Sequence, residues 1–205
     1  MSKESRMYNF EMRAALAEEK GAEITGRPIV FNADTDLSWF RERIAPGALD
    51  KTDLRDVRFL VNHNTDMIPL ARSRNNNANS TMQMTVDEEG MAIRVNLDVE
   101  GNPEAKSLYS AISRGDVSGM SFMFTVDGEE WEGLDTDYPT RTITSISKVF
   151  EVSAVTFPAY EQTSIEAAGA DEALERAKSA LESAKAEARD KAVRSEILEL
   201  IGGKN

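Results

Sequence analysis

The sequence contains no cysteine and a single histidine, His63. Without cysteine the chain can form no disulfide, no thiolate nucleophile and no thiolate metal site, and it suits a reducing compartment. With one histidine, a multi-histidine metal site is excluded, and any mechanism that needs an imidazole base depends on His63. A metal site built from carboxylates alone is possible, but nothing in the sequence supports one. We therefore expect no metal and no cofactor.

Positive charge and long apolar runs are also scarce. The 24 lysines and arginines against 36 aspartates and glutamates give a formal charge of -12, which disfavours unassisted binding to nucleic acid or anionic lipid. No run reaches the roughly 18 apolar residues of a membrane span, and the first residues lack the apolar core of a signal peptide. We therefore expect a soluble cytosolic protein, with no nucleic-acid or membrane partner, that acts on proteins or peptides.

Alternating apolar and polar residues predict a sheet-rich domain over residues 1–168. Residues 7–14 and 23–32 are expected to pair as one hairpin, and residues 81–99 form the clearest second hairpin, across the turn "DEEG". The segment 141–157 is rich in β-branched residues and predicts one long strand or two consecutive strands. These patterns favour an α+β fold that is mostly antiparallel sheet.

Helix signals are local and of two kinds. Asn102 as N-cap, Pro103 at the first helical position and Gly115 as the stop predict a short helix, and another is expected near Ala48. From Ala170 the Ala, Glu, Lys and Leu composition predicts a helix of roughly 30 residues, about 45 Å long. We predict that residues 169–205 form a separate helical tail, able to self-associate or to dock on a partner; a helix folded back on its own domain is the alternative.

The stretch "GDVSGMSFMF" carries two serines in a strand-like pattern. Period-two alternation places Ser118 on the face of the apolar residues Met120, Phe122 and Phe124, and Ser121 on the opposite face. Because the apolar face belongs in the core, Ser121 is expected to project towards a cleft. Ser118 is better explained as a turn residue, and a plain structural role for Ser121 remains an alternative.

Two further residues have chemical interest. The segment "VRFLVNHN" predicts a buried strand that delivers His63 to its exposed end, although a lone histidine there is usually only solvated or hydrogen-bonded. Glu151 lies within the apolar strand "KVFEVSAV", and burial without a partner would cost several kcal/mol. Its partner could be an arginine such as Arg72 or Arg141, or it could orient the His63 imidazole.

The chain resembles the prohead maturation proteases of tailed bacteriophages, which are distantly similar to the herpesvirus assemblins. The segments that carry the resemblance are "ITGRPIVFN", "FRERIAPGALDK", "VRFLVNHN", "ISRGDVSGMSFMF" and "FEVSAVTFPAYEQTSI". The resemblance implies a serine endopeptidase with a mostly antiparallel, assemblin-like β-barrel flanked by short helices, here followed by the long C-terminal helix.

The resemblance also implies roles and partners. The family's nucleophile falls on Ser121, its histidine on His63 and its acidic position on Glu151. The implied substrates are the major capsid protein and the scaffold protein, and the protease itself, inside the assembling procapsid in the host bacterial cytoplasm. A protease-like domain that only binds coat protein, as a non-catalytic scaffold, is the alternative.

Overall fold

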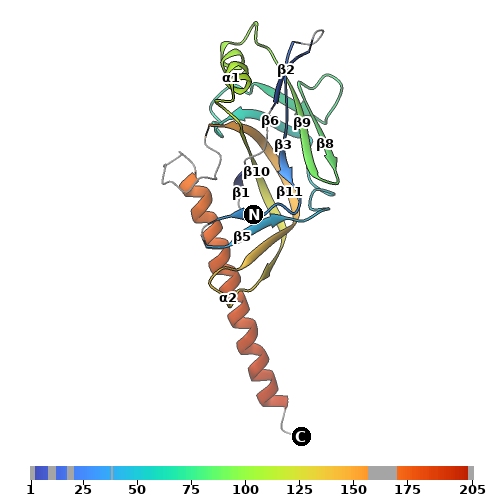
Figure 1. Ribbon diagram of the computed structural model, residues 1–205. Helices are drawn as coiled ribbons and strands as arrows, with labels where there is room; N and C mark the ends of the chain where they lie inside the picture. Colours follow the sequence, from blue (N-terminus) through green and yellow to red (C-terminus); the bar gives the residue numbers. More distant parts are fainter. Residues whose placement is uncertain (1–2, 9–12, 18–20, 38, 157–169, 203–205) are drawn as a thin grey trace.

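The computed structural model describes residues 3–8, 13–17, 21–37, 39–156 and 170–202 (Figure 1). The helices and strands, in chain order, are β1 (Lys3–Tyr8), β2 (Arg13–Ala17), β3 (Gly21–Val30), β4 (Thr35–Asp36), β5 (Arg41–Ile44), β6 (Asp56–Val61), β7 (Ala71–Arg74), β8 (Met82–Asp87), β9 (Gly90–Leu97), α1 (Pro103–Arg114), β10 (Gly119–Glu132), β11 (Thr140–Val155) and α2 (Ala170–Gly202). The α+β class predicted from the sequence is confirmed.

The strands form two sheets rather than the predicted barrel. Seven strands pair in one sheet, in the order β1-β10-β11-β5-β4, with β6 and β7 added beside β11. The second sheet has the order β2-β3-β9-β8. The described strands do not close into a barrel, since both sheets keep unpaired edges and join through side chains, with Phe59 and Phe122 from one packed in the same core as Ile93 from the other.

Strands β10 and β11 form the long central hairpin that positions the candidate site. They pair antiparallel along their length, with bulges near the middle. As predicted, the side chains of Met120, Phe122 and Phe124 are fully buried in the core. Burying one such side chain contributes about 1.5–3 kcal/mol, so this face fixes the register of β10 and holds Ser121 on the other face.

The predictions with strong local signals are confirmed. Strands β8 and β9 pair as a hairpin in which Met84 lies opposite Ile93, and β11 is one continuous strand. At α1, the Asn102 side chain accepts the backbone N–H groups of Glu104 and Ala105. Gly115 ends α1 in the left-handed region at φ 80°, where a residue with a Cβ would be strained.

Two predictions near the N-terminus are wrong. Met7 and Tyr8 belong to β1, which pairs with β10 in the large sheet, whereas Arg13 and Ala14 belong to β2, which pairs with β3 in the small one. The predicted hairpin therefore exists only as β2 and β3. Around Ala48 the chain makes successive turns instead of a helix, with Ala48 N–H bonded to Ala45 O and Asp50 N–H to Gly47 O.

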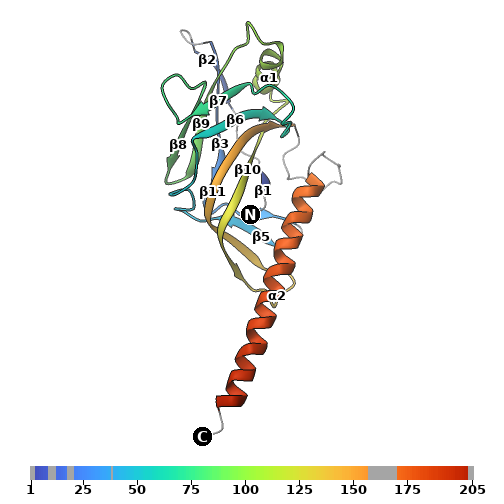
Figure 2. The same cartoon turned by 180° about the vertical axis from the view of Figure 1, so that it is seen from behind.

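The predicted C-terminal helix is present as α2. Leu181 is buried against Phe40, while the distal part of α2 runs beyond the sheets, as both views show (Figures 1 and 2). The predicted domain boundary at residues 168 and 169 lies outside the described residues, and the separate tail stays a prediction. Among the described residues no helix is long and apolar enough to cross a membrane.

Candidate active site

Three separate strands supply the candidate site on the face of the large sheet that points away from the core. Ser121 lies in β10 directly opposite Ser153 of β11, and Glu151 lies two residues before Ser153. Strand β6 runs parallel to β11 on its other side and pairs Leu60 with Ser153. The chain leaves β6 at Val61, so His63 emerges beside the strand that carries Glu151.

A short left-handed turn brings the imidazole back over the sheet. Asn62 and His63 both have positive φ, 50° and 57°, a conformation that costs a non-glycine residue about 1–3 kcal/mol. Hydrogen bonds to the end of β11 offset this strain. The backbone N–H of Asn62 donates to Ala154 O at 2.9 Å, that of His63 donates to Ser153 Oγ at 3.1 Å, and Asn62 Oδ1 accepts the N–H of Thr156 at 3.0 Å.

The three side chains form a linear hydrogen-bonded chain. His63 Nδ1 lies 2.6 Å from Glu151 Oε1, and His63 Nε2 lies 2.6 Å from Ser121 Oγ. An ionised carboxylate only accepts hydrogen bonds, so Nδ1 carries the proton and the Nε2 lone pair accepts the Ser121 hydroxyl. This geometry can withdraw a proton from Ser121 and stabilise the resulting imidazolium.

Glu151 is 2% exposed, and its partners are polar groups rather than an arginine. Besides His63, it accepts the Ser153 hydroxyl through Oε2 at 2.5 Å. The arginines considered from the sequence bind elsewhere: Arg72 pairs with Asp56, and the buried Arg141 pairs with three glutamates, Glu4, Glu42 and Glu129. Of the two alternatives, the contact with the imidazole is the one that the structure contains.

The sequence predicts that Ser121 projects towards a cleft. In the structure Ser121 does not face an open cleft. Its side chain is fully buried, between the flanking strands β1 and β11 and next to the His63 ring, whereas Ser118 is exposed ahead of β10. A cavity of about 540 Å³ opens beside the turn that holds the histidine, lined by Asn62, Asn64 and Met67 and by Leu108 of α1. Ser121 is therefore closed off from solvent in this structure.

Sequence reasoning missed two features of this sheet face. Ser153 was visible only as a neighbour of Glu151 on the same strand face, and nothing in the sequence linked it to the backbone of His63. The cross-strand pairing of Glu151 with Arg58 was also missed, because it depends on the position of β6 in the sheet. The part of the chain that the structure describes holds no group of three or more histidine or carboxylate side chains that could bind a metal ion.

The chain is similar to known phage proteins over most of its length. The family model described as caudovirus prohead serine protease matches residues 8–178. A curated relative, the prohead protease of Enterobacteria phage HK97, is 30% identical over 148 residues, which cover 69% of this chain and 58% of the relative. The chain thus spans less than two thirds of that relative's length, and no solved structure matches it significantly. The chain belongs to the caudovirus prohead serine protease family.

Proposed function

We propose that the chain is a serine endopeptidase of procapsid maturation, with Ser121 as nucleophile, His63 as general base and acid, and Glu151 as the group that orients the imidazole. The observation that carries the proposal is the continuous chain from Ser121 Oγ through the His63 ring to Glu151 Oε1, with 2.6 Å at both steps. Family membership supports the same reaction class.

In the acylation step, Ser121 Oγ attacks the carbonyl carbon of the scissile peptide bond while its proton passes to His63 Nε2. The imidazolium that forms is stabilised by the Glu151 carboxylate at Nδ1, which keeps its charge. The tetrahedral intermediate then collapses. The C–N bond breaks, Nε2 returns the proton to the leaving amine, and the N-terminal fragment stays on Ser121 as an ester.

Deacylation repeats these steps with water in place of the serine hydroxyl as the attacking group. His63 Nε2 removes a proton from a water molecule, whose oxygen attacks the ester carbonyl. Collapse of the second tetrahedral intermediate breaks the bond to Ser121 Oγ, which regains the proton from Nε2, and releases a new carboxyl terminus. Because Ser121 is fully buried in this state, the first step requires an opening of the segments around it, and opening can limit the rate.

The substrates proposed are the major capsid protein, the scaffold protein and the protease itself, cleaved within the procapsid in the host cytoplasm. The name of the phage relative supports a place in the prohead. The net charge of this chain, -12, also favours proteins over nucleic acid as partners.

A fluorophosphonate probe tests the enzyme against the scaffold alternative. We expect the probe to label the wild-type chain at Ser121 and to leave Ser121→Ala unlabelled, with intact mass reporting the adduct. Coexpression with the coat protein then reports cleavage of the coat protein and self-cleavage by new masses. Absence of labelling and of cleavage under assembly conditions would favour the non-catalytic scaffold protein.

A further inference from the structure

Ser153 connects two parts of the candidate site, the carboxylate of Glu151 and the backbone of His63. Its hydroxyl donates to Glu151 Oε2 at 2.5 Å, and its oxygen accepts the backbone N–H of His63 at 3.1 Å. The side chain is fully buried, so water cannot replace either bond. The two bonds reach the Glu151 carboxylate and the His63 backbone, whereas Ser121 contacts the ring at Nε2.

The two hydrogen bonds of Ser153 affect the His63 imidazole in different ways, one through Glu151 and the other through the His63 backbone. The bond to Glu151 fixes one carboxylate oxygen, so that the other is aimed at Nδ1. The bond from His63 N–H holds the backbone in the left-handed conformation, at φ 57°, that turns the ring towards Ser121. A small displacement of a catalytic group can lower the rate by about 100-fold, so both effects matter for proton transfer.

We infer that Ser153 is a fourth functional residue, a positioning residue that fixes the His63 imidazole in the orientation and tautomer needed to activate Ser121. The inference rests on the proposed function, since it assigns Ser153 a part in the same mechanism. It differs from a packing role because it predicts a change at the imidazole itself.

The test compares Ser153→Ala with Ser73→Ala as a matched control. Ser73 is also a fully buried strand serine whose oxygen accepts a backbone N–H, from Asn76 at 3.2 Å, and Asn76 also has a positive φ of 50°. Loss of Ser73 Oγ therefore reproduces the structural cost at a place that does not contact the imidazole. Ser153→Thr keeps the hydroxyl and serves as the rescue variant, and Ser153→Cys replaces Ser153→Ala if the latter does not fold.

The first readout is the rate of labelling by the fluorophosphonate probe, separated into the maximal rate and the half-saturating probe concentration. We expect Ser153→Ala to lower the maximal rate about 10- to 100-fold with little change in half-saturation, Ser153→Thr to recover most of it, and Ser73→Ala to match wild type. Equal maximal rates for Ser153→Ala and wild type would overturn the inference.

The second readout does not need activity. Because the sequence has one histidine, the ¹⁵N NMR signals of the imidazole need no assignment. We expect wild type and Ser73→Ala to show one tautomer, with the proton on Nδ1, and Ser153→Ala to show a mixture. An unchanged tautomer would contradict the inference. If wild type fails to react with the probe, the proposed function fails, and the NMR comparison still decides whether Ser153 positions the ring.

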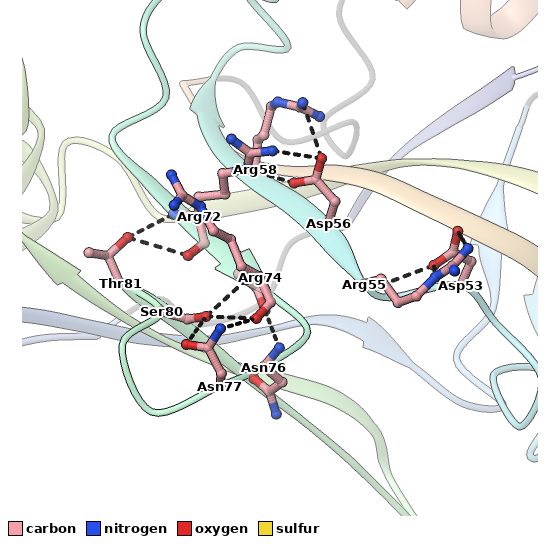
Figure 3. A network of polar contacts seen from close by, with 11 residues as sticks. Asp53, Arg55, Asp56, Arg58, Arg72, Arg74, Asn76, Asn77, Ser80 and Thr81 are labelled. Atoms are coloured by element: carbon pink, nitrogen blue, oxygen red, sulfur yellow. Dashed lines mark hydrogen bonds and ion pairs between the residues drawn. The ribbon is translucent and has the colours of Figure 1, made fainter.

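The same sheet face carries a second feature, three arginines on β6 and β7. Glu151 is paired with Arg58 across β11 and β6, and Arg58 with Arg72 across β6 and β7, so their side chains share one face. Arg74 lies opposite Asp56 on that face. Figure 3 shows Arg58 and Arg72 converging on Asp56, while Arg55 points away towards Asp53.

Charge on this face is not balanced. Asp56 binds Arg72 through two bonds of 2.6 and 2.9 Å, and that hydrogen bonding holds the pKa of Asp56 below its ordinary value. The contact of Arg58 with Asp56 is longer, 3.3 Å, and the Arg58 side chain is 42% exposed. Arg58, Arg72 and Arg74 therefore outnumber the two carboxylates of this face, Asp56 and the buried Glu151, and leave a positive surface on a chain whose net charge is -12.

The geometry points to Arg58 as a specificity residue that binds a carboxylate side chain of the substrate peptide. With strands about 4.8 Å apart and about 3.3 Å per residue, Arg58 lies about 12 Å from Ser121, the span of three or four extended residues. An aspartate or glutamate at that distance from the scissile bond would meet a partly exposed guanidinium. This inference also rests on the proposed function.

Cleavage-site profiling on a proteome-derived peptide library tests this subsite. We expect wild type to favour Asp or Glu at one position three or four residues from the cleaved bond, and Arg58→Glu to lose that preference. Arg55→Glu is the charge-matched control, because Arg55 is bonded to Asp53 away from this face, and it should keep the wild-type profile. A wild-type profile without acidic preference, or the same profile in Arg58→Glu, would refute the subsite. A wild type that cleaves nothing would instead count against the proposed function.

Discussion

Ser121 lies directly opposite Ser153 in the antiparallel pair of β10 and β11, and the two hydroxyls meet the same histidine from different sides. Ser121 contacts the ring at Nε2, whereas Ser153 contacts the backbone N–H of His63 and the carboxylate that faces Nδ1. One serine pair thus touches both ends of the hydrogen-bonded chain that runs from Ser121 through His63 to Glu151.

Ser121→Ala should abolish cleavage of the coat protein and leave the fold intact, because the change removes one oxygen and no core contact. Ser118→Ala should have little effect, since Ser118 is exposed ahead of β10. Mass spectrometry of the coat protein after incubation measures both, with circular dichroism as the control for folding. Retained cleavage by Ser121→Ala would remove Ser121 from the mechanism.

Glu151→Gln should lower the maximal rate about 10⁴-fold while the chain stays folded, as expected when the wrong tautomer is favoured. A glutamine can accept the Ser153 hydroxyl through its oxygen and then presents its NH₂ group to Nδ1, which must become the acceptor. The proton then sits on Nε2, where it blocks proton transfer from Ser121. Single-turnover cleavage and the ¹⁵N signals of His63 measure the two effects, and a Glu151→Gln variant with a wild-type rate would exclude the proposed orienting role.

Arg141→Met should destabilise the fold by about 3–5 kcal/mol, because it leaves buried carboxylates without a counter-charge. Arg141 is 1% exposed and binds Glu4, Glu42 and Glu129. Burial alone would lower the pKa of Arg141, but the hydrogen bonds that Arg141 donates to Glu4 and the charges of the three glutamates raise it above its ordinary value, so Arg141 stays charged at any working pH. Urea unfolding measures the loss. Arg194→Met, on the exposed face of α2, is the control and should change stability by less than about 0.5 kcal/mol.

The ion pair of Arg27 with Asp87 should make stability depend on acid pH. Hydrogen bonds from Arg27 lower the pKa of Asp87 to about 2. A carboxylate with a lowered pKa contributes stability above its unfolded value, about 3.9, and loses it as the pH falls through the folded value. Arg27→Met should therefore unfold at lower urea than wild type at pH 6, and the difference should shrink between pH 4 and pH 2. A difference that is independent of pH would show that Arg27 acts through packing.

Self-association through the C-terminal helix is tested on its distal part. Val193, Ile197 and Leu198 are exposed there, by 53%, 48% and 69%. Replacing all three with glutamine should leave helicity nearly unchanged and shift sedimentation velocity towards the monomer. The control variant is Leu181→Ala, which loosens the contact of α2 with Phe40 but leaves the distal surface of α2 unaltered. If wild type is monomeric at high concentration, the predicted association is wrong.

The sequence predicted the features that depend on neighbouring residues in the chain. It did not predict the features that depend on distant residues. The cap residues of α1, the alternation in β8 and β9 and the two faces of β10 all depend on neighbours in the chain. The separation of β1 from β2 could not be foreseen, because β1 pairs with a strand more than 110 residues away. The proposed role of Ser153 depends on the left-handed backbone of His63, and the burial of Arg141 depends on two glutamates far away in sequence, Glu4 and Glu42.

The pairing of β1 with β10 also sets the order of events during synthesis. Glu4 and Arg141 are 137 residues apart in sequence, so the strand beside Ser121 cannot be anchored until almost the whole domain has left the ribosome. At about 5–20 residues per second, this is a delay of roughly 7–27 s after Glu4 is made. The delay separates the synthesis of β1 from the first moment at which it can pair with the strand that carries Ser121.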